Sequence, residues 1–225
     1  MKMDGKALLD HGSFQRMSME MDAYDEKREV IIRQSRDILK ASKQAIFAMH
    51  RGNMDEASDK LELADQVIEQ LAPVIQAEQS LRHGSFSSAM EEYAEAQCFR
   101  HFLTAGTLVS LEQLNFVDRD EYLGGVVDFT GEVTRYAIVQ ATKRDIARVE
   151  ECRNIVDAIT GELIQFSFRN SPLRKKYDSL KYNLKKLENT LYELSLVAPN
   201  KAFKLSDDDE PPQDTNTEYS YQSSN

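Results

Sequence analysis

Glycine and proline are scarce in this chain of 225 residues, with nine and five copies respectively. No stretch shows the sustained alternation of apolar and polar residues that is typical of β-strands. Charged residues make up 29% of the chain and recur at helical spacing. These features predict an all-α fold with one sizeable hydrophobic core.

Cysteine and histidine are also rare, with two and four copies. Cys98 and Cys152 are too few for a disulfide framework and lack the spacing of a zinc site, so we expect reduced core thiols. The histidines are scattered and form no HExxH-like cluster. Catalysis by a Ser/His or Cys/His pair is therefore unsupported.

Long apolar runs are missing as well. None approaches the roughly 20 residues of a membrane span, and no signal peptide opens the chain. We therefore expect a soluble intracellular protein without a membrane partner, located in the cytoplasm, with the nucleus as a second candidate compartment. No basic nuclear-localisation cluster lies near the N-terminus.

The formal net charge is −10, and much of it lies at the C-terminus. The stretch 206–225 contains six acids and no Lys or Arg. We expect residues 199–225 to form a disordered acidic tail, residues 22–198 a single helical domain, and residues 1–21 a flexible lead-in. The acidity argues against a free-standing duplex binder, so a nucleic acid would need a local basic patch or a more basic partner.

A cationic stripe is expected on the first strong helix, which should run from about Asp22 to Arg51. Four basic residues spaced 3, 4 and 3 apart share one face of this helix: Arg33, Arg36, Lys40 and Lys43. Such a stripe is either a solvated face or a track for phosphate groups.

Two carboxylates lie where the helix from Met90 to Leu103 should carry apolar side chains. At 100° per residue, Glu92 and Glu95 share a sector with Phe99 and Phe102. Ionised carboxylates on an inward face are costly, so this pattern indicates a metal ion or a shared proton. The alternative is that both reach the edge of the stripe and pair with Arg or Lys.

A second acid pair lies on a helix that should begin near Asp118. Asp128, Glu132 and Arg135 share one narrow sector, and the rest of the circumference is largely apolar. Nearby glycines would let another backbone or a ligand approach closely; they are Gly124, Gly125 and Gly131. The alternative is an internal ion pair between Glu132 and Arg135.

Two further helices are expected, from about Thr142 to Phe168 and from Pro172 to Pro199. The second has an apolar seam over three heptads, from Leu173 to Leu194, suited to packing in a bundle or across a subunit interface. Its outer face is basic, and a solvated face is the plainer interpretation; it comprises Arg174, Lys175, Lys176, Lys181, Lys185 and Lys186.

The two acid pairs can meet if their helices pack antiparallel. Four carboxylates are not stable together without a cation, and an all-oxygen ligand set suits Mg²⁺ or Mn²⁺ rather than zinc. Such an ion can activate a water and stabilise charge on a phosphoryl group, so phosphodiester hydrolysis is the leading chemistry. A di-iron bundle normally adds two Glu-x-x-His motifs, but Cys98 and Arg135 occupy those positions here.

The same residues carry a family resemblance. The runs SRDILKASKQAIFAMHR (35–51), EEYAEAQCFRHFL (91–103) and EYLGGVVDFTGEVTR (121–135) resemble the translin family, and the similarity extends into LKYNLKKLENTLYEL (180–194). The resemblance implies an antiparallel, translin-like bundle of about six to seven helices. It further implies assembly with translin subunits into a hollow hetero-octamer that acts as a metal-dependent endoribonuclease.

The resemblance also implies site residues and substrates. The catalytic acids of the family fall on Glu92, Glu95 and Asp128, with Glu132 as a further metal ligand and Mg²⁺ or Mn²⁺ as the cofactor. The substrates would be single-stranded or nicked RNA, such as small-RNA passenger strands and transfer RNA fragments, with single-stranded DNA as a further ligand. We expect phosphate contacts from the cationic stripe and Arg135.

Two alternatives remain open. In the first, the chain is a non-catalytic subunit that binds RNA or DNA or acts as a scaffold, and its acids are structural ion pairs. In the second, it is an interaction protein built on the Leu173–Leu194 seam, without RNA affinity.

Overall fold

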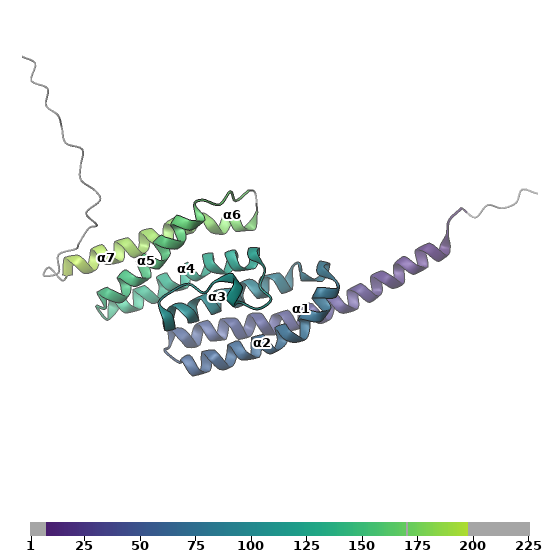
Figure 1. Cartoon of the computed structure of the whole chain (residues 1–225), viewed down its shortest axis with the longest axis horizontal. Helices are drawn as coiled ribbons and strands as arrows, with labels where there is room; N and C mark the ends of the chain where they lie inside the picture. The colour runs from purple at the N-terminus through teal and green to yellow at the C-terminus, as the bar shows by residue number, and fades with distance from the viewer. Residues whose placement is uncertain (1–7, 170, 198–225) are drawn as a thin grey trace, which may run out of the picture.

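All regular structure in residues 8–169 and 171–197, which this computed structural model describes, is helical (Figure 1). The long helices are α1 (His11–His50), α2 (Met54–Ala77), α3 (Ser85–Ala105), α4 (Arg119–Thr142), α5 (Ile146–Leu163) and α7 (Leu180–Val197). The short ones are α6 (Pro172–Tyr177) and the 3₁₀ turns Gln79–Arg82 and Leu111–Gln113. The predicted all-α fold is confirmed. The acidic tail at 199–225 lies outside the described residues.

Helix α3 lies at the centre of the bundle. It packs against α1 on one side and α4 on the other, while α2 lies against α1. Helices α5 and α7 pack on each other and on α4 (Figure 1). No helix in this part of the chain is long and apolar enough to cross a membrane.

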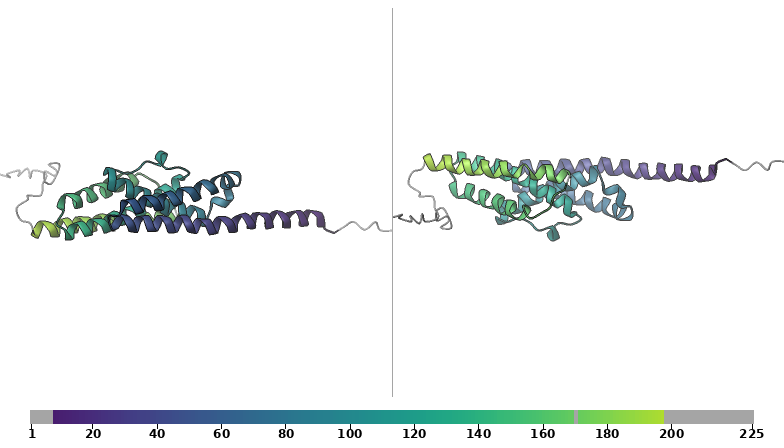
Figure 2. Two further views of the ribbon diagram at one scale, coloured as in Figure 1. Left: turned by 90° about the horizontal axis from the view of Figure 1, so that it is seen from below. Right: turned by 90° about the horizontal axis from the view of Figure 1, so that it is seen from above.

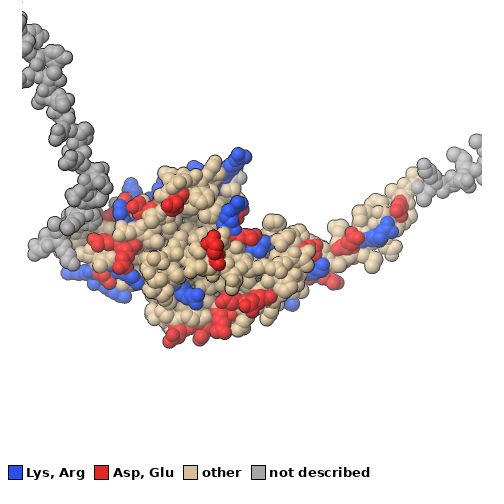
Figure 3. All heavy atoms as spheres, viewed as in Figure 1, with Lys and Arg blue, Asp and Glu red and all other residues tan. Residues whose placement is uncertain are grey.

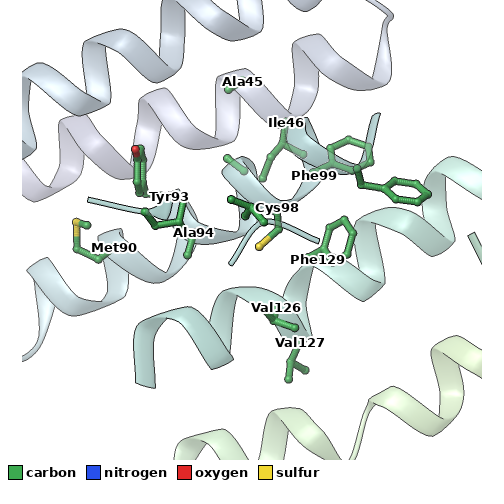
Figure 4. Packing of buried hydrophobic residues seen from close by; sticks show 14 of the residues in the cluster. Ala45, Ile46, Met90, Tyr93, Ala94, Cys98, Phe99, Val126, Val127 and Phe129 are labelled. Carbon is green, nitrogen blue, oxygen red and sulfur yellow. The ribbon is translucent and has the colours of Figure 1, made fainter. Parts of the chain in front are cut away.

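The core is built around aromatic side chains of α3 and α4. Phe99, Phe102 and Phe129 are fully buried, and the ring centres of Phe102 and Phe129 are 5.9 Å apart. Figure 4 shows Ala45 and Ile46 of α1 facing this cluster. The two cysteines, Cys98 and Cys152, are buried free thiols, as expected.

Helix α1 begins at His11, so the expected start at Asp22 is wrong. Residues 11–21, expected to form a flexible lead-in, are helical. Asp10 caps this helix, because its carboxylate accepts a hydrogen bond from the Ser13 backbone N–H at 3.2 Å. The N-terminal half of α1 extends beyond the bundle (Figure 2), and Phe14 and Met19 on it are 59% and 66% exposed.

The expected long C-terminal helix is divided into α6 and α7, with a break at Asp178 and Ser179. The Ser179 hydroxyl donates to the Lys176 carbonyl at 2.6 Å, a local bond that competes with helix continuation. The helix expected over 142–168 is also shorter at both ends. Its start moves to Ile146 because Arg144 adopts a left-handed conformation, with φ of 60°.

The Leu173–Leu194 seam packs inside the chain. Leu180, Leu187 and Leu191 are buried, and the other seam residues are partly buried against the same core. Helix α7 makes these contacts with α4 and α5. The seam therefore belongs to the bundle, which removes the main support for an interaction protein built on it.

Candidate active site

The site forms where α3 and α4 approach each other closely, at Gly124 and Gly125. A Cβ atom on Gly125 would lie 2.8 Å from the Glu91 carbonyl oxygen and 2.8 Å from the Glu95 nitrogen. Such distances are too short for any side chain, so only glycine permits this approach. The expectation that the glycines admit another backbone is confirmed at Gly125.

The two predicted acid pairs are brought together at this contact. Glu95 is almost fully buried, and Glu92, Asp128 and Glu132 lie around it with partly exposed side chains. Burial, together with the negative charges of these three neighbours, raises the pKa of Glu95 to about 9. Burial and the charge of Glu92 raise the pKa of Asp128 to about 6. Burial and the surrounding negative charges therefore favour the neutral form of Glu95.

The cationic stripe of α1 ends at this cluster. Lys43 Nζ lies 3.2 Å from Glu92 Oε1, and the Lys43 side chain is 58% exposed. The other three stripe residues are exposed on the same helix. A polyanion lying along the stripe would therefore reach the carboxylates at its Lys43 end.

His50 is a member of the site that the sequence analysis did not identify. It forms a hydrogen bond with Glu132, and its ring packs on Phe99 with 4.8 Å between centroids. The bond from His50 lowers the pKa of Glu132, and Arg135, 3.5 Å away, acts in the same direction. The sequence contained a signal for His50. It follows Arg36 and Lys43 at intervals of seven residues, about two helical turns, and so lies on the same face of α1.

Lys176 and Glu91 are the other two residues that the sequence analysis missed. Lys176 Nζ lies 2.5 Å from Asp128 Oδ2 and also contacts the Glu91 carboxylate. The interpretation of Lys176 as part of a solvated outer face is therefore wrong. Helix α6 packs on α4 and directs this side chain inward, whereas the adjacent Lys175 is exposed.

The donor chemistry of the cluster fits a hard divalent cation, because every carboxylate offers oxygen ligands. As the side chains are placed, no three Asp, Glu, His or Cys residues in the described ranges are close enough together to hold a metal ion. The acids instead face the chain's own cations: Lys43, His50, Arg135 and Lys176. A metal site would require these carboxylates to turn toward one another.

Charge is unevenly distributed over the surface. Figure 3 shows acidic side chains along the edge formed by α2, and basic ones around α6. The net charge of −10 therefore coexists with local cationic regions on α1 and α6. This arrangement meets the requirement for a local basic patch near the carboxylates.

Comparison with known proteins gives a consistent result. A sequence profile of the Translin family matches residues 26–197. Translin-associated protein X from Mus musculus is 28% identical over 226 residues, covering 82% of this chain and 78% of that protein. The Translin-associated protein X homolog from Schizosaccharomyces pombe is 26% identical over 199 residues, covering 81% of this chain and 84% of that protein.

Solved structures share the fold. The crystal structure of apo NeC3PO superposes with a TM-score of 0.75 at 22% identity, covering 84% of this chain and 100% of that one. The structure of AfC3PO in complex with duplex RNA gives a TM-score of 0.74 at 21% identity, with the same coverage.

Proposed function

Because the chain belongs to the translin family, we propose that it is the catalytic subunit of a metal-dependent endoribonuclease. The observation that carries this proposal is the convergence of two acid pairs at the α3–α4 contact. Burial raises the pKa of Glu95 to about 9, and the charges of three neighbouring carboxylates act in the same direction. Without a catalytic or metal-binding role, a buried acid in such surroundings is a liability to stability.

We assign roles to the residues by their positions. Glu92, Glu95 and Asp128 would hold the ion and position a water beside it, and Glu132, held by His50, would support them. When bound, Mg²⁺ or Mn²⁺ lowers the pKa of a water and stabilises negative charge on the phosphoryl group. Arg33, Arg36, Lys40, Lys43 and Arg135 hold the RNA phosphates next to the acids.

The proposed substrate is single-stranded or nicked RNA, including small-RNA passenger strands and transfer RNA fragments, and single-stranded DNA is a further ligand. One structural relative is a complex with duplex RNA, which supports nucleic acid as the ligand class. The proposed partner is translin, in a hetero-octamer. The family membership supports this partner, since translins themselves match part of the chain; the Gallus gallus protein is 33% identical over 85 residues.

The proposal is tested with the full chain, co-purified with its partner subunits, on end-labelled single-stranded RNA. We expect cleavage in Mg²⁺, none in EDTA, and at least a 100-fold loss of rate for Glu95→Gln with assembly unchanged. Glu150→Gln changes an exposed acid on α5 and should leave the rate unaltered. Retained cleavage by Glu95→Gln would remove this residue from the mechanism.

A second candidate is a non-catalytic RNA-binding or scaffold subunit. It is favoured by the cations that face the acids, since Glu92, Asp128 and Glu132 each have a basic partner. In that case RNA would bind equally well in Mg²⁺ and EDTA, and no cleavage would occur in either. Neutralising the acids would then change stability but not RNA affinity.

A further inference from the structure

Lys176 is the cation that joins the two acid-bearing helices. Its ammonium group contacts Glu91 on α3 and lies 2.5 Å from Asp128 on α4. By contrast, among the residues that the structure describes, Lys43 pairs with Glu92 alone, and His50 pairs with Glu132 alone. A divalent ion in the proposed site would make the same kind of link, between carboxylates of α3 and α4.

We propose that Lys176 is an internal counter-ion, which neutralises the carboxylate cluster in the metal-free protein and leaves it when a divalent ion binds. This inference rests on the proposed metal site. It adds that Lys176, a residue of the chain itself, competes with the metal ion for the carboxylates. It accounts for the side-chain arrangement, in which Asp128 pairs with Lys176 and no three possible ligands in the described ranges come close enough together to hold a metal ion.

Coulomb repulsion favours the exchange. An ion held by Asp128 would lie close to the Lys176 ammonium group, which is 2.5 Å from the same carboxylate. Two positive centres so close together repel each other in a partly buried site. A divalent ion at Asp128 therefore weakens the hold on Lys176, and Lys176 weakens the binding of the ion.

The chain around Lys176 allows it to leave. Helix α6 has only six residues, from Pro172 to Tyr177, and is separated from α7 by the break at Asp178 and Ser179. The lysine stem is flexible, and its side chain is already 34% exposed. Lys176 can therefore swing to solvent without disturbing α4 or α7.

The first experiment compares Mn²⁺ binding by the wild type, Lys176→Met and Lys175→Met, measured by electron paramagnetic resonance on the assembled complex. Lys176→Met keeps the length of the side chain and removes its charge, and Lys175→Met is the matched control on the same short helix. We expect Lys176→Met to lower the Kd for Mn²⁺ by about fivefold or more, and Lys175→Met to leave it unchanged. In EDTA, the melting temperature of Lys176→Met should also be lower than that of the wild type, and Mn²⁺ should restore this melting temperature.

Equal Kd values for Lys176→Met and the wild type, in a complex that binds Mn²⁺ and cleaves RNA, would overturn the counter-ion inference and leave the proposed function standing. Absence of Mn²⁺ binding in both proteins would overturn both the counter-ion inference and the proposed metal-dependent function. Weaker binding by Lys176→Met would also overturn the inference, because it would show that Lys176 supports the metal site.

A second measurement uses the wild type and does not depend on a folded variant. Amine acylation of Lys176 and Lys175 is followed by mass spectrometry with and without Mg²⁺. Displacement of Lys176 should raise its acylation rate in Mg²⁺ several-fold relative to Lys175. A constant ratio of the two rates, at Mg²⁺ concentrations that saturate the site, would contradict the exchange.

Discussion

At the residue scale, the surroundings of Glu95 change its pKa strongly. Its pKa rises from 4.5 to about 9, first through burial and then through the charges of Glu92, Asp128 and Glu132. Between these two values the folded protein keeps a proton that the unfolded chain has released. Stability must therefore fall as pH rises through this range.

We predict that, in EDTA, the free energy of unfolding decreases between pH 5 and pH 9. Glu95→Gln should flatten this dependence and stabilise the protein at pH 8 by about 1 to 2 kcal/mol, because the amide cannot ionise. Urea denaturation at several pH values measures both effects. Glu150→Gln, the exposed control, should keep the wild-type slope, and the same slope in Glu95→Gln would refute the assignment.

Protons and metal ions should compete at the same acids, since Asp128 has a pKa of about 6 and Glu95 one of about 9. We therefore predict that Mn²⁺ affinity of the wild type rises with pH from 6 to 9, as the carboxylates lose protons. Calorimetric titrations in buffers of different ionisation enthalpy would also show proton release. A pH-independent affinity would place the metal elsewhere.

At the element scale, the spacing between α3 and α4 depends on Gly125. A methyl group there would meet backbone atoms at 2.8 Å, and backbone cannot move as a flexible side chain does. The position of Glu95 relative to Asp128 therefore depends on the absence of a side chain on α4.

We predict that Gly125→Ala destabilises the protein by about 2 kcal/mol and lowers RNA cleavage, because the two helices must separate. Gly161→Ala is the matched control, since Gly161 lies in α5 with open space around its Cβ position. It should be neutral or stabilising by up to about 1 kcal/mol. Thermal melts and cleavage assays would test both, and equal effects of the two changes would contradict the close-packing argument.

The start of α4 is held by a buried ion pair. Arg82 lies 2.6 Å from both Asp118 and Glu121, and it donates to the Phe116 carbonyl at 2.7 Å. The side chains of Arg82 and Glu121 are only 7% and 2% exposed. This pair ties the chain before α3 to the first turn of α4.

We predict that Arg82→Ala costs about 3 kcal/mol and lowers the Tm by about 6 to 12 °C, because it leaves Glu121 buried without its cation. Arg119→Ala removes an arginine whose pair with Asp120 is fully on the surface, 78% and 77% exposed. Its effect should be below about 0.5 kcal/mol. A similar Tm for both variants would show that the buried pair is dispensable.

At the scale of the whole molecule, a chain with a net charge of −10 would have to hold RNA, its proposed ligand, through a local surface. The stripe on α1 is the proposed surface, and it ends beside the carboxylates at Lys43. The contribution of the stripe to RNA affinity should depend on salt concentration, because phosphates that bind Lys or Arg release counter-ions.

We predict that Arg36→Gln weakens single-stranded RNA binding and reduces the slope of log affinity against log salt concentration by about 0.7. Lys143→Gln, an exposed cation outside the stripe at the end of α4, should leave the slope unchanged. Fluorescence anisotropy between 50 and 300 mM salt would measure both. An unaltered slope in Arg36→Gln would assign the phosphate track to another surface.

Much of the fold and part of the site could be predicted from helical periodicity. The pattern placed Glu95 on an inward face of one helix and Asp128 on a mostly buried second helix, and the structure has both there. The glycines before Asp128 indicated a close approach, which Gly125 makes. These features are local, because the face on which a side chain lies follows from the rotation per residue within one helix.

The Glu132–Arg135 pair, three residues apart, was among the alternatives read from the sequence and is present at 3.5 Å, but the tertiary structure alone decided which distant cations meet the acids. His50 reaches Glu132 across 82 positions of sequence, and Lys176 reaches Asp128 across 48. Such pairs depend on how helices pack, and packing is set by the summed burial of many side chains, which no single helix encodes. The break before α7 was likewise hidden, because the leucine repeat continues through Asp178 and Ser179 although the helix does not. The sequence by itself thus determined the helices and their acidic faces, and the packing of α1 and α6 decided what those faces meet.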